Sequence, residues 1–176
     1  MLPPDGLALR GDCREGFQRR QADVVHDKTI IGWVEYVDFP EWEIEGVKAK
    51  IDTGARTSAL HVEGLELLSN GQARFRVVYS RRAPFKRKTV TATVVKRARV
   101  RSSTGEYAER YFVRARIRLG DTIKVIELSL VSREKMLFRM LIGRKALERD
   151  FLVDVARRTA VTKRPKMKRK TQNQIK

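Results

Sequence analysis

Hydrophobic and polar positions alternate along several segments of this chain, which is the pattern of half-buried β-strands. The clearest segment is Arg110–Leu119, where Val113, Ala115 and Ile117 alternate with three arginines. Further segments with strand composition are residues 29–39, 47–51, 73–79, 89–95, 123–131 and 151–155, whereas residues 60–68 fit either a strand or a turn-rich connection.

Two features depart from this simple alternation. The pattern slips near Val125 and Ile126, which predicts a β-bulge there. Helical composition is confined to Arg144–Arg149, after the short apolar run Met140–Gly143, and suffices for one or two turns. The whole pattern therefore predicts a mainly β, mostly antiparallel barrel or sandwich with one short helix near its C-terminal end.

Both ends of the chain lack this patterning. Residues 1–28 are polar and contain prolines and glycines, so we expect a disordered N-terminal extension. Residues 157–176 are basic and become low in complexity from Lys163, so we expect a disordered tail. One domain is predicted between them, at residues 29–156, which is long enough to bury a core.

Composition places the protein in a reducing environment. Cys13 is the single cysteine, which excludes an internal disulfide framework. No stretch approaches the roughly 20 apolar residues of a membrane span, and the start of the chain does not read as a signal peptide. We therefore expect a cytoplasmic protein without a membrane partner.

The net charge of +18 is concentrated in two segments. Residues 81–101 and residues 157–176 each contain nine Lys or Arg and no acidic residue. Such segments attract nucleic acid, acidic polypeptide or an anionic surface, although a basic tail also serves simply as a solubilising surface. No aromatic residue other than Phe85 interleaves the first segment, which argues against a dedicated single-strand reader.

The candidate chemistry lies in the stretch VKAKIDTGARTSALH, residues 47–61. Asp52 ends a predicted strand and is followed at once by Thr53 and Gly54, residues suited to a tight loop. Two carboxylates that are brought together share a proton, so one acts as a base on water while the other acts as an acid. Since the chain holds one Asp-Thr-Gly, the second Asp52 would come from another subunit across a two-fold axis.

The motif Asp52-Thr53-Gly54-Ala55, followed downstream by Leu141-Ile142-Gly143-Arg144, resembles the paired motifs of retropepsin-like aspartic peptidases. From about residue 29 to 154, the chain is most similar to a bacterial branch labelled ATP-dependent zinc proteases, some of which are associated with ATP-grasp glutamate ligases. This resemblance implies a closed, single-lobed acid-protease β-barrel with one short C-terminal helix. It also implies a homodimer.

The resemblance makes Asp52 the catalytic residue and assigns further residues to the site. We expect Thr53 to brace the dyad, Gly54 to bind substrate backbone, and His61 to be a hydrogen-bonded support near the loop. The complete set of predicted substrate-binding residues is Thr53, Gly54, Ala55, Arg81, Arg82, Lys86, Arg87 and Lys88, and the predicted supporting residues are Arg56, His61, Gly143 and Arg144.

Two departures from retroviral-type enzymes shape these expectations. Arg56 stands where many of those enzymes have an acid that pairs with the arginine of Ile-Gly-Arg, so Arg144 needs another partner. The segment 79–101, predicted to form the flap, is basic, which suits an acidic substrate such as a glutamate-rich tail. Unlike a serine at this position, Ala55 has no side-chain donor that could bond the catalytic carboxylate and lower its pKa, which predicts a less acidic optimum than that of pepsin-like enzymes.

No cofactor is expected. The chain has two histidines, one cysteine and no His-Glu-x-x-His motif, a poor ligand set for zinc even if His61 and Glu63 are counted. No phosphate-binding glycine motif is present, so any ATP dependence would come from a partner such as an ATP-grasp ligase. The alternative to a peptidase is a non-catalytic basic module that docks on ribosomal RNA or on an acidic protein.

Overall fold

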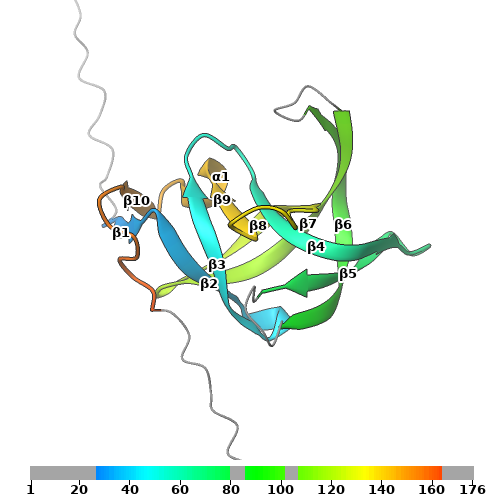
Figure 1. Ribbon diagram of the computed structural model, residues 1–176, viewed down its shortest axis with the longest axis horizontal. Coiled ribbons are helices and arrows are strands. Elements are labelled where there is room, and N and C mark those ends of the chain that lie inside the picture. The colour runs from blue at the N-terminus through cyan, green and yellow to red at the C-terminus, as the bar shows by residue number, and fades with distance from the viewer. Residues whose placement is uncertain (1–26, 80–85, 102–106, 164–176) are drawn as a thin grey trace, which may run out of the picture.

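The computed structural model describes residues 27–79, 86–101 and 107–163, and β-strands make up most of these residues (Figure 1). The strands are β1 (Thr29–Gly32), β2 (Val34–Phe39), β3 (Ile44–Asp52), β4 (Ser58–Leu67), β5 (Gln72–Val78), β6 (Arg87–Arg101), β7 (Tyr107–Leu119), β8 (Thr122–Val131), β9 (Met140–Gly143) and β10 (Phe151–Asp154). A 3₁₀ turn, η1 (Pro40–Trp42), and one helical turn, α1 (Arg144–Leu147), complete the described elements.

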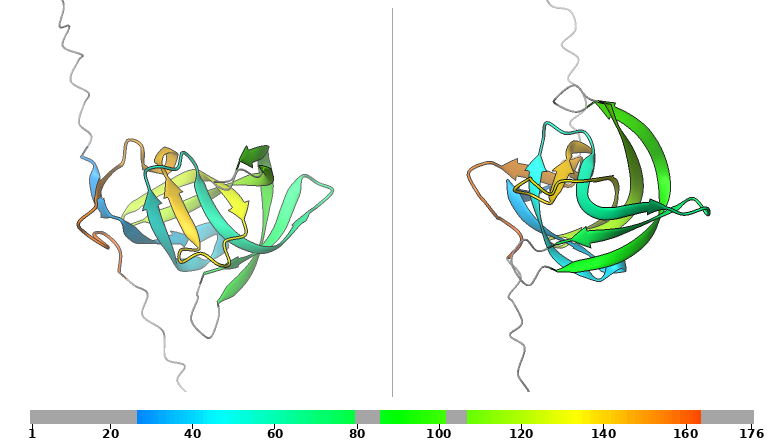
Figure 2. Two further views of the ribbon diagram at one scale, coloured as in Figure 1. Left: turned by 45° about the horizontal axis from the view of Figure 1, so that its top comes forward. Right: turned by 45° about the vertical axis from the view of Figure 1, so that its right-hand side comes forward.

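Eight of the strands form one curved sheet that closes on itself (Figures 1 and 2). The strand order is β2-β3-β9-β4-β5-β6-β7-β8, and the additional pairings β2–β7 and β4–β8 complete a ring. Strands β1 and β10 form a separate two-stranded sheet. This arrangement confirms the predicted mainly β architecture with one short helix.

Parallel pairings tie the N-terminal half of the ring to the C-terminal half. β3 pairs in parallel with β9, so that Asp52 stands opposite Gly143, and β4 pairs in parallel with β8. The other pairings within the large sheet are antiparallel. The predicted catalytic motif and the Gly-Arg motif are therefore neighbours, although about ninety residues separate them in sequence.

The core lies inside the ring and follows the predicted alternation. Along β7, Val113, Ala115, Ile117 and Leu119 are buried whereas the arginines between them are exposed. Burying such aliphatic side chains contributes about 1.5–3 kcal/mol each relative to leaving them in water. The period of two read from the sequence therefore describes this face of the sheet correctly.

The bulge predicted at Val125 and Ile126 is wrong. β8 pairs with β7 without a register shift from Thr122 to Leu130. Ile123 and Val125 point outward and remain 55% and 54% exposed, whereas Ile126 is buried. The apparent slip arises because apolar side chains occupy both faces of this strand, so its alternation is regular in space but not in hydrophobicity.

Residues beyond 156, the predicted end of the domain, still pack against it. The backbone N–H groups of Trp33 and Val34 donate to the carbonyl oxygens of Arg157 and Arg158, at 2.9 and 2.8 Å. Gly32 makes this approach possible, because a Cβ at that position would lie 2.6 Å from the oxygen of Arg158. The C-terminal segment is therefore part of the folded unit at least to Thr162.

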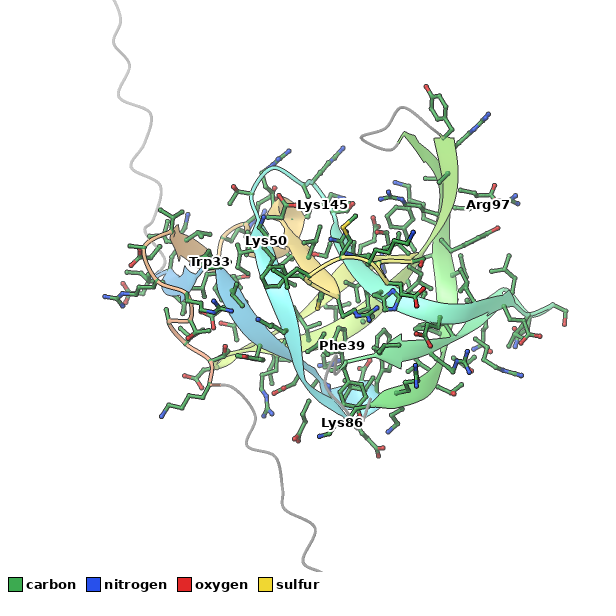
Figure 3. The ribbon with its side chains drawn as sticks, viewed as in Figure 1. Trp33, Phe39, Lys50, Lys86, Arg97 and Lys145 are labelled. Carbon is green, nitrogen blue, oxygen red and sulfur yellow. The ribbon has the colours of Figure 1, made fainter. Side chains whose placement is uncertain are left out.

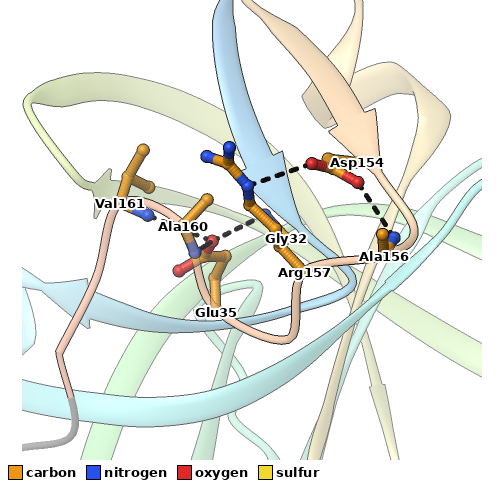
Figure 4. Close-up of polar contacts among 7 residues, drawn as sticks. All are labelled: Gly32, Glu35, Asp154, Ala156, Arg157, Ala160 and Val161. Atoms are coloured by element: carbon orange, nitrogen blue, oxygen red, sulfur yellow. Dashed lines mark hydrogen bonds and ion pairs between the residues drawn. The ribbon is translucent and has the colours of Figure 1, made fainter.

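A buried carboxylate holds this segment in place (Figure 4). Glu35 is fully buried, and its Oε1 accepts hydrogen bonds from the N–H groups of Gly32, Ala160 and Val161, at 2.7, 2.7 and 3.3 Å. Its Oε2 accepts from Thr162, both from the backbone N–H at 3.1 Å and from the hydroxyl. Five donors thus satisfy this buried carboxylate.

Within the described ranges, no helix is long and apolar enough to cross a membrane.

Candidate active site

The Asp52 loop, residues 52–57, begins where β3 ends. Asp52 Oδ1 accepts hydrogen bonds from the backbone N–H groups of Gly54 and Ala55, at 3.1 and 3.2 Å. The second oxygen, Oδ2, receives no hydrogen bond from any residue that the structure describes. The carboxylate is half-buried, so one oxygen is fixed by the loop while the other remains available to a ligand or to water.

Arg144, which is distant in sequence, binds the backbone of the Asp52 loop. Its Nη1 donates to the carbonyl oxygens of Thr53 and Gly54, at 2.8 and 2.9 Å, and its backbone N–H donates to Ala55 at 2.9 Å. The partner that Arg144 lacks at Arg56 is thus supplied by backbone carbonyls of the same loop. The carbonyl of Arg56 is itself used, because it accepts from the N–H of Lys145 at 3.1 Å.

Gly143 permits the close approach of β9 and the Asp52 loop. A Cβ at this position would lie 2.6 Å from the carbonyl carbon and oxygen of Thr57, and those are backbone atoms that have little room to move. The N–H of Gly143 donates to the Ser58 hydroxyl at 3.1 Å, and the Ser129 hydroxyl donates to the carbonyl of Ser58 at 3.2 Å. Steric fit and buried hydrogen bonds together fix the position of the loop.

The predicted substrate-binding residues do not all gather at this loop. Thr53 and Gly54 are exposed beside Asp52, as substrate or dimer contact requires. Lys88 pairs instead with Glu43, directly before the start of β3, and nine residues of strand at about 3.3 Å each separate that end from Asp52.

Figure 3 shows the same separation within the basic segment. Lys50 and Lys145 lie on the side of the Asp52 loop, whereas Lys86 lies on the opposite side. Arg87 pairs with Glu63 at 3.3 Å, and Arg81 and Arg82 fall outside the described residues. Within one protomer, the structure therefore does not bring Lys86 or Lys88 to Asp52.

The outer ends of β6 and β7 lie on the side of the Asp52 loop (Figures 1 and 2). Pairing of the two strands places basic side chains over aromatic rings, a juxtaposition that the sequence of β6 alone conceals. The three pairs are Lys96 over Phe112 at 5.2 Å, Arg97 over Tyr111 at 5.8 Å and Arg99 over Tyr107 at 5.0 Å. These contacts stiffen a basic hairpin by cation–π attraction.

His61 is almost fully buried, with 1% of its surface exposed. Its Nδ1 accepts a hydrogen bond from the backbone N–H of Arg133 at 2.7 Å, and its Nε2 lies 3.9 Å from Glu63 Oε1, beyond hydrogen-bond range. Burial and the nearby charge of Arg139 lower the pKa of His61 below its ordinary value. His61 is therefore the buried, hydrogen-bonded residue that the sequence predicts, and it is neutral at pH 7.

Two arginines that sequence reasoning missed lie beside His61. The carbonyl of Arg139 accepts from the N–H of His61 at 2.7 Å. Arg133 donates through Nε to the carbonyl of Phe138 at 3.2 Å, and burial lowers its pKa while the negative charge of Asp52 opposes that shift. The available signal was the placement of Arg139 inside the apolar run Leu137–Ile142, where a solvent-facing arginine is unexpected.

Asp154 is engaged in contacts with residues close to it in sequence. Asp154 Oδ1 accepts from the N–H of Ala156 at 2.9 Å, and its Oδ2 pairs with Arg157 at 3.2 Å. Across the described ranges, no three His, Cys, Asp or Glu side chains are grouped closely enough to hold a metal ion. The described residues therefore do not fit the ligand set of a protein zinc site.

The ring-shaped sheet, the Asp-Thr-Gly loop and the Gly-Arg motif that locks it define the retropepsin-like class of aspartic peptidase folds. Residues 30–164 match the family described as "RimB-like: Retropepsin-like aspartic endopeptidase RimB". The chain belongs to this family.

Relatives with a different name and one solved structure are also similar to this chain. The chain is 34% identical over 131 residues to a "Probable alpha-L-glutamate ligase" of Shewanella pealeana, covering 73% of this chain and 29% of that protein. It is 31% identical over 137 residues to the protein of the same name from Desulfotalea psychrophila, covering 76% and 30%. The chain thus spans less than a third of these relatives.

A crystal structure of a Legionella pneumophila protein of unknown function has the same fold, with a TM-score of 0.64 and 25% identity. The match covers 76% of this chain and 98% of that one.

Proposed function

We propose that the protein is a cytoplasmic aspartic peptidase that cleaves acidic, glutamate-rich polypeptides, using a dyad of two Asp52 side chains in a homodimer. The observation that carries this proposal is the state of Asp52. Backbone N–H groups fix Oδ1, and Oδ2 receives no hydrogen bond from the described residues. A carboxylate that is oriented but incompletely satisfied suits a group that must bind and activate water.

The proposed reaction follows from two carboxyl groups that share one proton. The ionised Asp52 removes a proton from water as the water oxygen attacks the peptide carbonyl carbon, and the protonated Asp52 donates to the carbonyl oxygen. The tetrahedral intermediate then collapses: the C–N bond breaks as the Asp52 that took the water proton gives it to the leaving nitrogen, and the other Asp52 regains a hydroxyl proton as the new carboxyl group forms. Arg144 has a positioning role, since it holds the carbonyls of Thr53 and Gly54 and thereby the N–H groups that orient Asp52.

The acidic substrate is inferred from the net charge of the chain and from the names of its relatives. The chain carries a net charge of +18, and such a field raises the local concentration of anionic polypeptides. The matched relatives are named as probable alpha-L-glutamate ligases, which makes glutamate chains the acidic polymer we propose. An ATP-grasp ligase or the ribosome would then be partners that present the substrate.

A cleavage assay on glutamate-rich peptides tests the proposal. We expect Asp52→Asn to reduce turnover by at least about 10³-fold, because the amide can neither accept nor relay the proton. Circular dichroism would confirm that the variant remains folded. Retention of turnover in folded Asp52→Asn would reject the proposed mechanism.

A second candidate is a binding domain without catalysis, and the names of the relatives favour it. A domain carried within proteins named as ligases could serve to hold an acidic product or ribosomal RNA. In that case, deleting residues 163–176 would remove binding while Asp52→Asn would change nothing. Equal cleavage of neutral and polyglutamate peptides at low salt would argue against the acidic substrate under either reading.

A further inference from the structure

Three nitrogen atoms beside β9 are buried and unsatisfied. They are Nε2 of His61 and Nε and Nη1 of Arg139, and none has a hydrogen-bond partner among residues 27–79, 86–101 and 107–163. The two side chains belong to paired strands, since the N–H of His61 donates to the carbonyl of Arg139 at 2.7 Å. They therefore share one region of the fold.

All three atoms are donors. Because His61 Nδ1 accepts a hydrogen bond from the Arg133 N–H at 2.7 Å, Nδ1 carries no proton. The proton of the neutral ring must then be on Nε2, which makes Nε2 an N–H donor. The guanidinium of Arg139 has donors only. The region thus offers several N–H groups and, within hydrogen-bond distance, no described acceptor.

The nearest carboxylate does not fill this role. Glu63 Oε1 lies 3.9 Å from His61 Nε2, too far for a hydrogen bond, and Glu63 Oε2 pairs with Arg87 at 3.3 Å. Leaving a buried donor without an acceptor destabilises the folded protein, and more so when the donor is charged. An acceptor from outside this protomer would remove this destabilisation, and a carboxylate would also neutralise the charge of Arg139.

The region is electrostatically linked to Asp52 through Arg133. The backbone of Arg133 binds His61, and the same residue lies close enough to Asp52 for the aspartate charge to affect its pKa. The strand register gives the spacing: four residues of strand, at about 3.3 Å each, separate Arg139 from Gly143, which stands opposite Asp52. A side chain several residues from the scissile bond would therefore be the one to reach His61 and Arg139.

We propose that His61 and Arg139, next to Arg133, form a specificity subsite that binds the carboxylate of an acidic side chain in the substrate. The inference rests on the proposed function for the identity of its ligand. Arg139 and His61 are the specificity-determining residues of this subsite, whose buried donor atoms would have to become accessible when substrate binds, and Arg133 positions the ring of His61. A glutamine side chain would satisfy fewer of the donors than a glutamate side chain and would leave the Arg139 charge unpaired.

Binding to the Asp52→Asn protein tests the subsite without relying on cleavage. We would measure the Kd of tetraglutamate and of tetraglutamine by calorimetry. The parent should prefer tetraglutamate by at least about tenfold, and Arg139→Met should lose most of this preference. The matched control is Arg116→Met, which removes the same charge from an exposed arginine paired with Glu41 at 2.9 Å. Arg116→Met should keep the preference.

Thermal unfolding separates this role from a structural one. Without ligand, Arg139→Met should raise the melting temperature by about 2–6 °C, since it removes unsatisfied buried donors and keeps the apolar stem. Tetraglutamate should stabilise the parent but not Arg139→Met. A preference that Arg139→Met retains, or that Arg116→Met loses equally, would overturn the subsite. If discrimination holds but the wild type cleaves no peptide, the peptidase proposal fails and the subsite stands.

Discussion

Glu35 and Arg139 both bring charged side-chain atoms into the interior of the same small fold, and their surroundings are opposite. The carboxylate of Glu35 receives five hydrogen bonds, four of them from backbone N–H groups. Nε and Nη1 of Arg139 donate no hydrogen bond to any described residue. A charge whose bonds are all supplied by the fold stabilises the fold, whereas a charge left without partners must be retained for another reason.

This contrast distinguishes a buried polar residue that stabilises the fold from buried polar residues that we assign to function, and it does not depend on the proposed chemistry. Glu35 joins β2 to residues 160–162 and so extends the domain past its predicted end. By contrast, Nε2 of His61 and Nε and Nη1 of Arg139 have no hydrogen-bond acceptor among the described residues. The two sites should therefore respond to substitution with opposite signs of stability change.

Glu35→Ala should produce the largest effect. Removing the carboxylate leaves five donors unsatisfied in the interior, so we expect a loss of about 3–5 kcal/mol in the free energy of unfolding. Urea denaturation would measure this, with Glu41→Ala as a surface control that changes stability by less than about 0.5 kcal/mol. A decrease of less than about 1 kcal/mol in the free energy of unfolding of Glu35→Ala would contradict the stabilising role that distinguishes Glu35 from Arg139.

Thr162→Val tests one part of the same network with a change of similar shape. The hydroxyl donates to Glu35 and accepts from the N–H of Tyr36 at 2.8 Å. Losing both bonds should destabilise the protein by about 1–2 kcal/mol. Hydrogen exchange should show faster exchange at residues 160–162, and unchanged protection there would contradict the role assigned to this segment.

His61 gives a smaller, pH-dependent effect of predictable sign. Its pKa in the folded protein lies below the ordinary value of 6.5, so the unfolded chain binds more protons as the pH falls through this range. The free energy of unfolding should therefore decrease as the pH falls from 6.5 toward the lowered pKa, and should be constant above 6.5 as far as His61 is concerned. Denaturation at several pH values would show this slope.

The matched variant for this titration is His61→Asn, whose side-chain oxygen can still accept from the Arg133 N–H. The slope attributed to His61 should be absent in His61→Asn. The same slope in both proteins would assign the titration to other groups.

Local patterns predicted much of the fold. Strict alternation predicted the two faces of β7, and the composition of residues 144–149 predicted the turn of helix near the C-terminal end of the domain. The prediction of a bulge in β8 was wrong because Ile123 and Val125 are apolar although they lie on the outer face. In the sequence, apolar residues on both faces give the same pattern as a shift of register. Asp52 could be singled out because its strand-ending position and glycine neighbour are local features.

The partners of the site residues could not be predicted, because they depend on distant pairings. Arg144 binds carbonyls of Thr53 and Gly54 only because β9 lies beside β3. The pairing of β4 with β9 likewise brings His61 to Arg139. Glu35 meets residues 160–162 across some 125 residues of sequence. The roles of these charged side chains therefore follow from contacts that the sequence does not reveal.

The central claim, a dyad shared between two subunits, is tested most directly by mixing wild-type protein with Asp52→Asn at constant wild-type concentration and allowing subunits to exchange. If each active dimer needs two Asp52 side chains, equal amounts should reduce peptide cleavage per wild-type subunit to about half, and a large excess of the variant should bring it toward zero. Cleavage per wild-type subunit that stays constant at every ratio would contradict the shared dyad.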